Sequence, residues 1–243
     1  MSMRRLLALA LLALGPAAVI QLASASARGQ EDVERGFDLY AAGCSTCHGL
    51  GGEGTTQGPS LVGVGPAAVD FMLSTGRMPL ADPGEQPVRN PSAYGPDEIA
   101  AIVAYVISLG PGGPSIPEVM PAAGGLPRGR SVYAANCLAC HGAGAQGASV
   151  GGGAVAPALE DSTPTQLAEA PRIGPGAMPV FDERVIDEQD MNSLVRYVIS
   201  LRTGQDRGGL NLGRVGTVTE GLIGWLVGMG LLVLVIRMTG TRT

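Results

Sequence analysis

Lysine is absent from this chain, and histidine, phenylalanine and tryptophan are rare, with two, three and one residues respectively. All 16 basic residues are therefore arginines, against 21 acids, and the formal net charge is −5. Because nucleic-acid binding needs a basic surface, this balance argues against nucleic acid as a partner. The shortage of aromatic side chains also means that small domains of this chain need core material from another source.

Alternation of apolar and polar residues, the pattern of a half-buried β-strand, is missing as well. The sequence therefore predicts an all-α fold with long irregular loops. The helices are expected over residues 31–43, 67–75, 96–109, 128–136, 165–170 and 187–202.

All four cysteines and both histidines fall in two copies of one motif, Cys-x-x-Cys-His, at residues 44–48 and 137–141. This is the attachment signature of c-type haem, in which both thiols bind one porphyrin and the histidine ligates its iron. Two such cysteine pairs could instead bind a structural zinc ion, and one pair could be a redox dithiol. Neither alternative explains a histidine after each pair, so two covalently bound haem c groups are predicted. The attachment residues would be Cys44, Cys47, Cys137 and Cys140, and the iron ligands His48 and His141.

The motifs belong to a longer internal repeat. The segment Arg35–Cys44 recurs as Arg128–Cys137 with arginine, glycine, tyrosine and cysteine in the same places, and Tyr-Val-Ile-Ser-Leu occurs at both 105–109 and 197–201. The chain is therefore expected to be a tandem duplication with one haem in each copy. The expected parts are a first domain at 31–110, a linker rich in proline and glycine at 111–127, and a second domain at 128–208.

Met78 and Met178 are predicted as the second axial ligands of the two irons. Each lies before a proline and two residues after a glycine, at equivalent places in the repeats. Ligation by histidine and methionine is the electron-transfer arrangement, and no histidine is left over for a bis-histidine site. Methionine more often fills a core, and that role is expected for Met72 and Met191. Arg77, beside Met78, is expected either to pair with a haem propionate or to lie on the surface.

This order of parts resembles class I cytochrome c in both copies. In that family a glycine and an aromatic residue precede the haem motif, as Gly36 and Tyr40 do here, and an aromatic of the last helix, here Tyr105, packs against the glycine. The resemblance implies the same contact for Gly129, Tyr133 and Tyr197. It also implies that loop prolines, Pro59 and Pro157, offer their carbonyl groups to the haem-ligating histidines and so orient the rings.

Both ends of the chain carry targeting patterns. Residues 1–27 combine a basic start, an apolar run and an Ala-Ser-Ala cleavage sequence. This is typical of a secretory signal, although an uncleaved membrane anchor fits too. Residues 217–237 are expected to form a transmembrane helix, followed by arginines on its cytoplasmic side. The haem domains are therefore expected outside the cytoplasm, at the plasma membrane.

Taken together, the signal segment, two haem domains and the C-terminal helix resemble the dihaem cytochrome c (cytochrome cc) subunit of the actinobacterial cytochrome bcc complex, a quinol–cytochrome c reductase. Two segments, Gly58–Gly65 and Ser74–Pro79, are similar to that family's first domain. The resemblance implies a relay of electrons from the Rieske iron–sulfur protein of a menaquinol-oxidising complex to the copper centre of an aa3-type oxidase. The partners would be the cytochrome b subunit, the Rieske subunit and that oxidase.

Two other function classes stay open at this point. One is a dihaem electron-transfer subunit of another membrane dehydrogenase or oxidase, and the other is a dihaem peroxidase-type enzyme. On the first interpretation, as on the bcc interpretation, the chain makes no bonds in a substrate and only transfers electrons. The peroxidase interpretation needs one iron with an open coordination position.

Overall fold

The computed structural model describes residues 29–202 and 217–240. These residues fall into two compact units, the first made of residues up to 118 together with 168–182, the second of residues 119–167 and those from 183 on. The predicted signal or anchor at 1–27 lies outside the described residues.

The first unit is built from a helix that runs to residue 43, followed by loops and further helices. The labelled elements are α2 (Ser45–His48), α3 (Pro66–Ser74) and α4 (Pro96–Ser108). Both α3 and α4 begin at a proline, whose fixed φ suits the first helical position. At the start of α4 the side chain of Glu98 accepts a hydrogen bond from the Gly95 amide (2.8 Å) and so caps the helix.

Two contacts hold this unit together. A hydrophobic core brings together side chains from α3, α4 and the first helix, with Tyr40 and Ile102 almost completely buried. The first helix also crosses α4 at Gly36, where a Cβ atom would overlap the Ala101 carbonyl and approach the Cβ of Tyr105. This confirms the predicted glycine–aromatic crossing of the first repeat.

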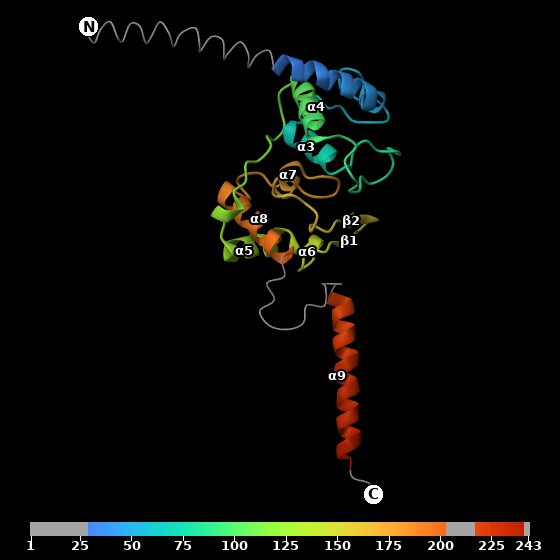
Figure 1. Cartoon of the computed structure of the whole chain (residues 1–243), viewed down its shortest axis with the longest axis vertical. Coiled ribbons are helices and arrows are strands. Elements are labelled where there is room, and N and C mark those ends of the chain that lie inside the picture. Colours follow the sequence, from blue (N-terminus) through green and yellow to red (C-terminus); the bar gives the residue numbers. More distant parts are fainter. Residues whose placement is uncertain (1–28, 203–216, 241–243) are drawn as a thin grey trace, which may run out of the picture. The chain divides into compact units, whose positions relative to one another are not determined.

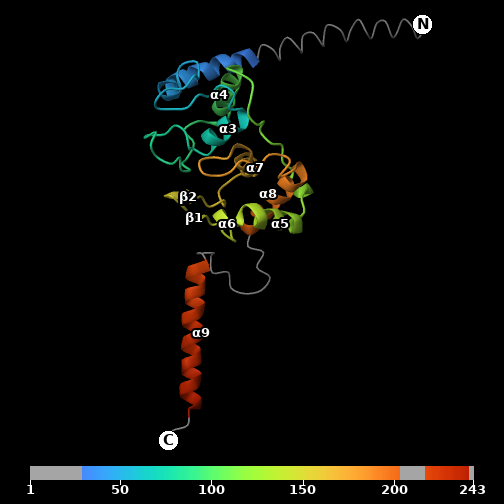
Figure 2. The same cartoon turned by 180° about the vertical axis from the view of Figure 1, so that it is seen from behind.

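The second unit repeats that crossing with α5 (Leu126–Asn136) and α8 (Glu188–Arg202), which lie side by side in both views (Figures 1 and 2). A Cβ on Gly129 would overlap the Ser193 carbonyl and approach the Cβ of Tyr197. The Tyr133 and Tyr197 rings lie with their centroids 5.6 Å apart. Between the two helices in sequence comes α6 (Leu138–His141), which carries the end of the second haem motif.

The expectation of a purely α-helical fold is wrong in the second repeat. A short antiparallel hairpin, β1 (Ala148–Gly151) and β2 (Ala154–Ala156), follows the haem motif (Figure 1). It occupies an insertion, because Gly54 and Pro59 are five positions apart in the first repeat whereas Gly147 and Pro157 are ten apart. The hairpin buries little on either face. Its residues therefore do not alternate in polarity, and no strand could be predicted from that pattern.

Helix α7 (Pro164–Ile173) extends past the expected range 165–170, and its residues from Ala168 on belong to the first unit. The loop after it is closed by hydrogen bonds from the Phe181 amide to the Pro171 carbonyl (2.8 Å) and from Arg172 to the Phe181 carbonyl (2.9 Å). The other predicted helices are confirmed to within a residue or two.

The linker is bound at both ends by contacts within each unit. In the first unit the Ala67 amide donates to the Pro114 carbonyl (3.2 Å). In the second, a 3-10 turn (Pro121–Ala123) was not expected, and α8 binds the segment around it. The amides of Met120 and Gly125 donate to Asn192 (2.6 Å) and Ser193 (3.0 Å), and Arg196 donates to the Gly124 carbonyl (2.5 Å).

Helix α9 (Thr217–Thr239) is the predicted transmembrane helix. Its segment Gly221–Thr239 has a mean hydropathy of 2.1, and in the part of the chain that is described it is the one helix long and apolar enough to cross a membrane. A 19-residue helix is about 28 Å long, close to the roughly 30 Å of a bilayer core.

Candidate haem sites

His48, at the end of α2, is buried and oriented by the loop that follows. Its Nδ1 donates to the Pro59 carbonyl (2.8 Å), as predicted. A carbonyl oxygen only accepts, so Nδ1 carries the proton and Nε2 keeps a free lone pair for a metal. The ring is enclosed closely, because a Cβ at Gly58 would lie 3.1 Å from its Cε1 atom.

His141 repeats this arrangement in the second unit. Its Nδ1 donates to the Pro157 carbonyl (3.0 Å), and the side chain is 8% exposed. Burial lowers the pKa of this imidazole and outweighs the opposite effect of the hydrogen bond to Pro157. The neutral ring that results is the form that ligates iron.

In each repeat a tyrosine hydroxyl bonds the backbone next to the histidine, a detail that the sequence interpretation missed. The hydroxyl of Tyr40 donates to the carbonyl of Gly49 (2.7 Å), and that of Tyr133 to the carbonyl of Gly142 (2.6 Å). Each accepting carbonyl belongs to the residue directly after the histidine. The equal spacing of tyrosine and glycine in the two repeats was the available signal, but the bond itself depends on how the chain turns after the motif.

None of the four cysteines forms a disulfide. Burial raises the pKa of the Cys44 thiol, and burial with the neighbouring Cys140 raises that of Cys137 to about 11. Cys44 also packs against the hydrophobic core of the first unit. Cys44 and Cys137 therefore have apolar surroundings of the kind that a porphyrin ring prefers, whereas Cys140 is exposed.

The structure brings Met78 to the same hydrophobic core as Cys44. The amide of Met78 donates to the Met72 carbonyl (3.1 Å) at the end of α3, so its loop is held against that helix. Met191 is 2% exposed on α8, as expected for a core residue, whereas Met72 on α3 is only half-buried and its core role stays a prediction.

Met178 is half-buried in the loop after α7, where its amide donates to the Pro175 carbonyl (3.2 Å). This loop belongs to the first unit and His141 to the second. The pairing of Met178 with His141 therefore remains a prediction from the repeat.

Arg77 is 7% exposed, so it does not lie on the surface, which was one of its two expected roles. Its guanidinium carbon lies 4.9 Å from the centre of the Phe71 ring. The Nη1 atom is buried and has no hydrogen-bond partner among the described residues. A buried donor of this kind fits a c-type haem, whose propionates are anions, and so does the pair of histidines with free Nε2 atoms.

Glu169, on α7, is a buried acid that the sequence interpretation did not single out. It is fully buried, and burial together with the neighbouring Asp70 of α3 raises its pKa to about 9. Because α7 and α3 lie far apart in sequence, no local pattern could have revealed this pair.

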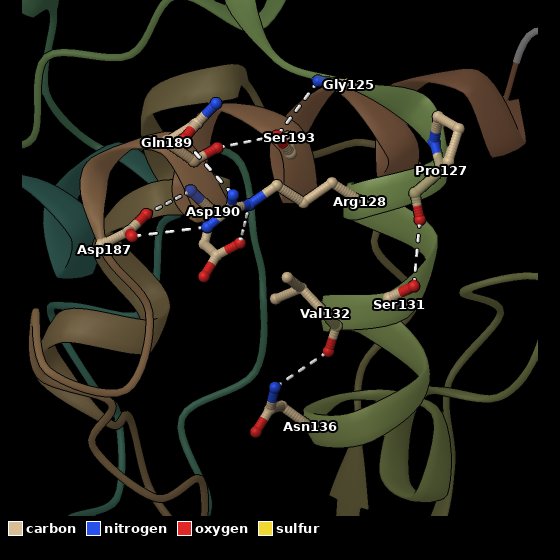
Figure 3. A network of polar contacts seen from close by, with 10 residues as sticks. All are labelled: Gly125, Pro127, Arg128, Ser131, Val132, Asn136, Asp187, Gln189, Asp190 and Ser193. Carbon is tan, nitrogen blue, oxygen red and sulfur yellow. Dashed lines mark hydrogen bonds and ion pairs between the residues drawn. The ribbon is translucent and has the colours of Figure 1, made fainter.

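The second unit carries a polar cluster at the start of α8, shown in Figure 3. The side chain of Arg128, on α5, extends to Asp190 (2.5 Å), Gln189 (3.3 Å) and Asp187 (3.4 Å). Ion pairs to both acids are present. The cluster fastens α5 to α8 beside the Gly129 crossing.

Comparisons with known proteins agree with the duplication. Residues 33–110 match the family model described as cytochrome c. Residues 124–198 match the model described as cytochrome c oxidase, cbb3-type, subunit III. Each model therefore matches one haem-motif repeat, and cytochrome c domains imply covalently bound haem c.

Cytochrome bc1 complex subunits align along most of the chain, and an oxidase subunit along a smaller part of it. A cytochrome bc1 complex cytochrome c subunit of Corynebacterium diphtheriae is 34% identical over 241 residues, 92% of this chain and 85% of the relative. The subunit of the same name in Mycobacterium tuberculosis is 34% identical over 218 residues, 86% of this chain and 78% of the relative. A cbb3-type cytochrome c oxidase subunit CcoP of Azospirillum is 30% identical over 192 residues, 70% of this chain and 62% of the relative.

Proposed function

The chain belongs to the family of cytochrome c subunits of cytochrome bc1 complexes, and from this premise we propose that it is a membrane-anchored dihaem cytochrome. It takes electrons from the Rieske iron–sulfur protein of a menaquinol-oxidising complex and passes them to the copper centre of an aa3-type oxidase. When bound, each haem supplies a one-electron Fe(III)/Fe(II) couple. The remaining roles fall to the chain's own side chains.

These side chains hold and orient the two groups. Cys44 and Cys47 attach the first haem and Cys137 and Cys140 the second. His48 with Met78, and His141 with Met178, are the proposed axial ligands. The observation that carries the proposal is the pair of buried imidazoles, each with Nδ1 bonded to a proline carbonyl and Nε2 free. Such bonding fixes the ring plane and makes the nitrogen a better ligand.

The proposed partners follow from family membership and from α9. The relatives' names place them in a cytochrome bc1 complex, which supports a cytochrome b and a Rieske subunit as neighbours of this chain. Helix α9 supports a membrane anchor, with Arg237 on the cytoplasmic side. The haem units then lie on the extracytoplasmic side, where they can exchange electrons with a Rieske protein and a copper centre.

A terminal-oxidase subunit is the second candidate. It is favoured by the cbb3-type match over residues 124–198 and by the similarity to CcoP. The cbb3-type model covers only the second repeat, and the first repeat matches the cytochrome c model instead. The chain also spans a smaller share of CcoP than of the bc1-complex relatives. The bc1-type assignment therefore takes precedence.

The test is purification of the tagged full-length chain from membranes of its host, with identification of the subunits that accompany it. We expect two haem c per chain by pyridine haemochrome assay, together with a cytochrome b and a Rieske protein. Both haems should be reduced when a menaquinol analogue is added. Subunits of a cbb3-type oxidase in place of cytochrome b and the Rieske protein would contradict the proposal and support the second candidate.

Paired cysteine variants test the number and position of the haems. Cys44→Ser with Cys47→Ser, and separately Cys137→Ser with Cys140→Ser, should each leave one haem c per chain. A single haem in the unmodified protein, or no loss in either variant, would overturn the dihaem assignment.

A further inference from the structure

Arg77 is a buried cation without an anion. It is 7% exposed, and its Nη1 atom has no hydrogen-bond partner among the described residues. The guanidinium lies over the face of the Phe71 ring, a cation–π contact. Burying a charge without a counter-charge is strongly unfavourable. The guanidinium of Arg77 therefore needs an anionic partner in the functional protein.

The protein residues around Arg77 do not supply that anion. The charged side chain that acts on it is Arg89, a second cation, which makes the burial more costly. The acid of the adjacent helix, Asp70, interacts with Glu169 instead. In the described structure, no carboxylate forms an ion pair with Arg77.

The position of Arg77 is fixed by the backbone around it. The amides of Arg77 (2.9 Å) and Met78 (3.1 Å) both donate to the Met72 carbonyl, and the buried Thr75 hydroxyl donates to the Phe71 carbonyl (2.5 Å). The loop is therefore rigidly tied to α3. Arg77 is the direct neighbour of the proposed iron ligand Met78 in this loop. Met78 and Cys44 pack against the same hydrophobic core.

The second repeat has no cation at the position that corresponds to Arg77. The residue that corresponds to Arg77 is Ala177, between Gly176 and Met178, and it is exposed. The two proposed haems thus have the same types of protein ligand, but the residue directly before the methionine is charged only in the first repeat.

We propose that Arg77 binds a propionate of the first haem and holds the reduction potential of that haem above the value that its ligands alone would give. This inference rests on the proposed function, since it needs a haem attached at Cys44 and Cys47. The electron adds to Fe(III) to give Fe(II), which lowers the local positive charge by one, and no proton or other reactant is involved. A fixed cation, or a propionate neutralised by that cation, therefore stabilises the reduced iron relative to the state without it.

The test is a spectroelectrochemical titration of the purified complex with Arg77→Gln, which removes the charge and keeps a similar size. At a fixed applied potential near the midpoint, the ratio of reduced to oxidised first haem should fall about tenfold, because the lost unit charge interacts differently with Fe(III) and Fe(II) in a medium of low dielectric constant. The second haem should titrate unchanged. The first haem is identified in the Cys137→Ser/Cys140→Ser background, which the proposed function leaves with that haem alone.

Two further variants make the result specific. Arg35→Gln removes one positive charge from an exposed site of the same unit and should leave both haems unchanged, because water and salt screen it. Arg77→Lys keeps the charge but not the planar fork that grips a carboxylate, so it should give a smaller shift in the same direction. Equal behaviour of Arg77→Lys and the unmodified protein would overturn the propionate contact.

An Arg77→Gln titration that matches Arg35→Gln would overturn the whole inference. The same sample also separates this failure from that of the proposed function. Two haem c by pyridine haemochrome and an intact near-infrared methionine–iron band show that both haems and their ligands are in place. Their loss in the unmodified protein would instead refute the proposed function itself.

Discussion

The two repeats orient their histidines in the same way but stabilise the surrounding helices differently. Each has a histidine bonded to a proline carbonyl and a tyrosine bonded to the carbonyl of the next residue. Around this shared frame, the second repeat adds the Arg128 cluster and a β-hairpin. The first has a buried arginine, Arg77, directly before its methionine, where the second has Ala177. Duplication has therefore kept what orients an imidazole and has varied the charges and loops outside it.

The largest effects are expected from the two methionines. Met78→Ala and Met178→Ala should each abolish one of two methionine–iron absorbance signals and lower the reduction potential of that haem, because a thioether ligand raises it. Optical spectroscopy of the oxidised protein and redox titration measure both effects. Met191→Leu is the matched control, since Met191 is a buried core residue and a similar volume is tolerated. An unchanged spectrum for Met178→Ala would show that the repeats differ in ligation.

Next in size are the two helix crossings. Gly36→Ala and Gly129→Ala each place a methyl group against a backbone carbonyl, and overpacking of this kind costs about 1–3 kcal/mol. Chemical denaturation followed by circular dichroism should show a similar loss of stability in both variants. Gly95→Ala is the control, because its Cβ would meet only the Glu98 side chain, at 3.7 Å. A loss in one repeat alone would mean that the crossings are not equivalent.

The buried acid of α7 gives a pH-dependent prediction. Its pKa is about 9 in the folded chain and 4.5 otherwise, so at a pH between these values Glu169 is protonated in the folded chain and ionised in the unfolded chain. Folding therefore takes up a proton there, and stability falls as the pH rises from about 4.5 towards 9. Glu169→Gln removes this dependence, so its Tm should match that of the unmodified protein near pH 4 and exceed it increasingly above.

Thermal unfolding at a series of pH values measures this effect, with the exposed Glu183→Gln as control. An equal gain at every pH would contradict the assignment. Such a result would mean that glutamine simply packs better there, without any change in proton uptake.

The smallest effect is expected at the arginine that begins each repeat. Arg128 pairs with Asp187 and Asp190, whereas in the described part of the first repeat its counterpart Arg35 forms no ion pair. Arg128→Ala should lower the Tm slightly in dilute buffer and not in high salt, since exposed pairs are weak and screened. Arg35→Ala should have no effect in either condition. Equal responses would show that the cluster in Figure 3 adds nothing to stability.

Much of the site was predictable because it is encoded locally. The Cys-x-x-Cys-His motif places thiols and imidazole on one turn of chain. The glycine–tyrosine spacing carries over from one repeat to the other, so the crossings at Gly36 and Gly129 and the partners Pro59 and Pro157 could be named in advance. Haem ligation by these residues stays a prediction.

What the sequence by itself determined is thus the set of short-range patterns: helices with their starts, two haem motifs, and an apolar C-terminal helix. Only the tertiary structure decided that Arg77 is buried without an anion, that Glu169 lies beside Asp70, and that an insertion of small residues folds into a hairpin. The physical reason is that burial and charge pairing depend on segments far apart in the chain. Local propensity does not predict which distant side chains will be buried together.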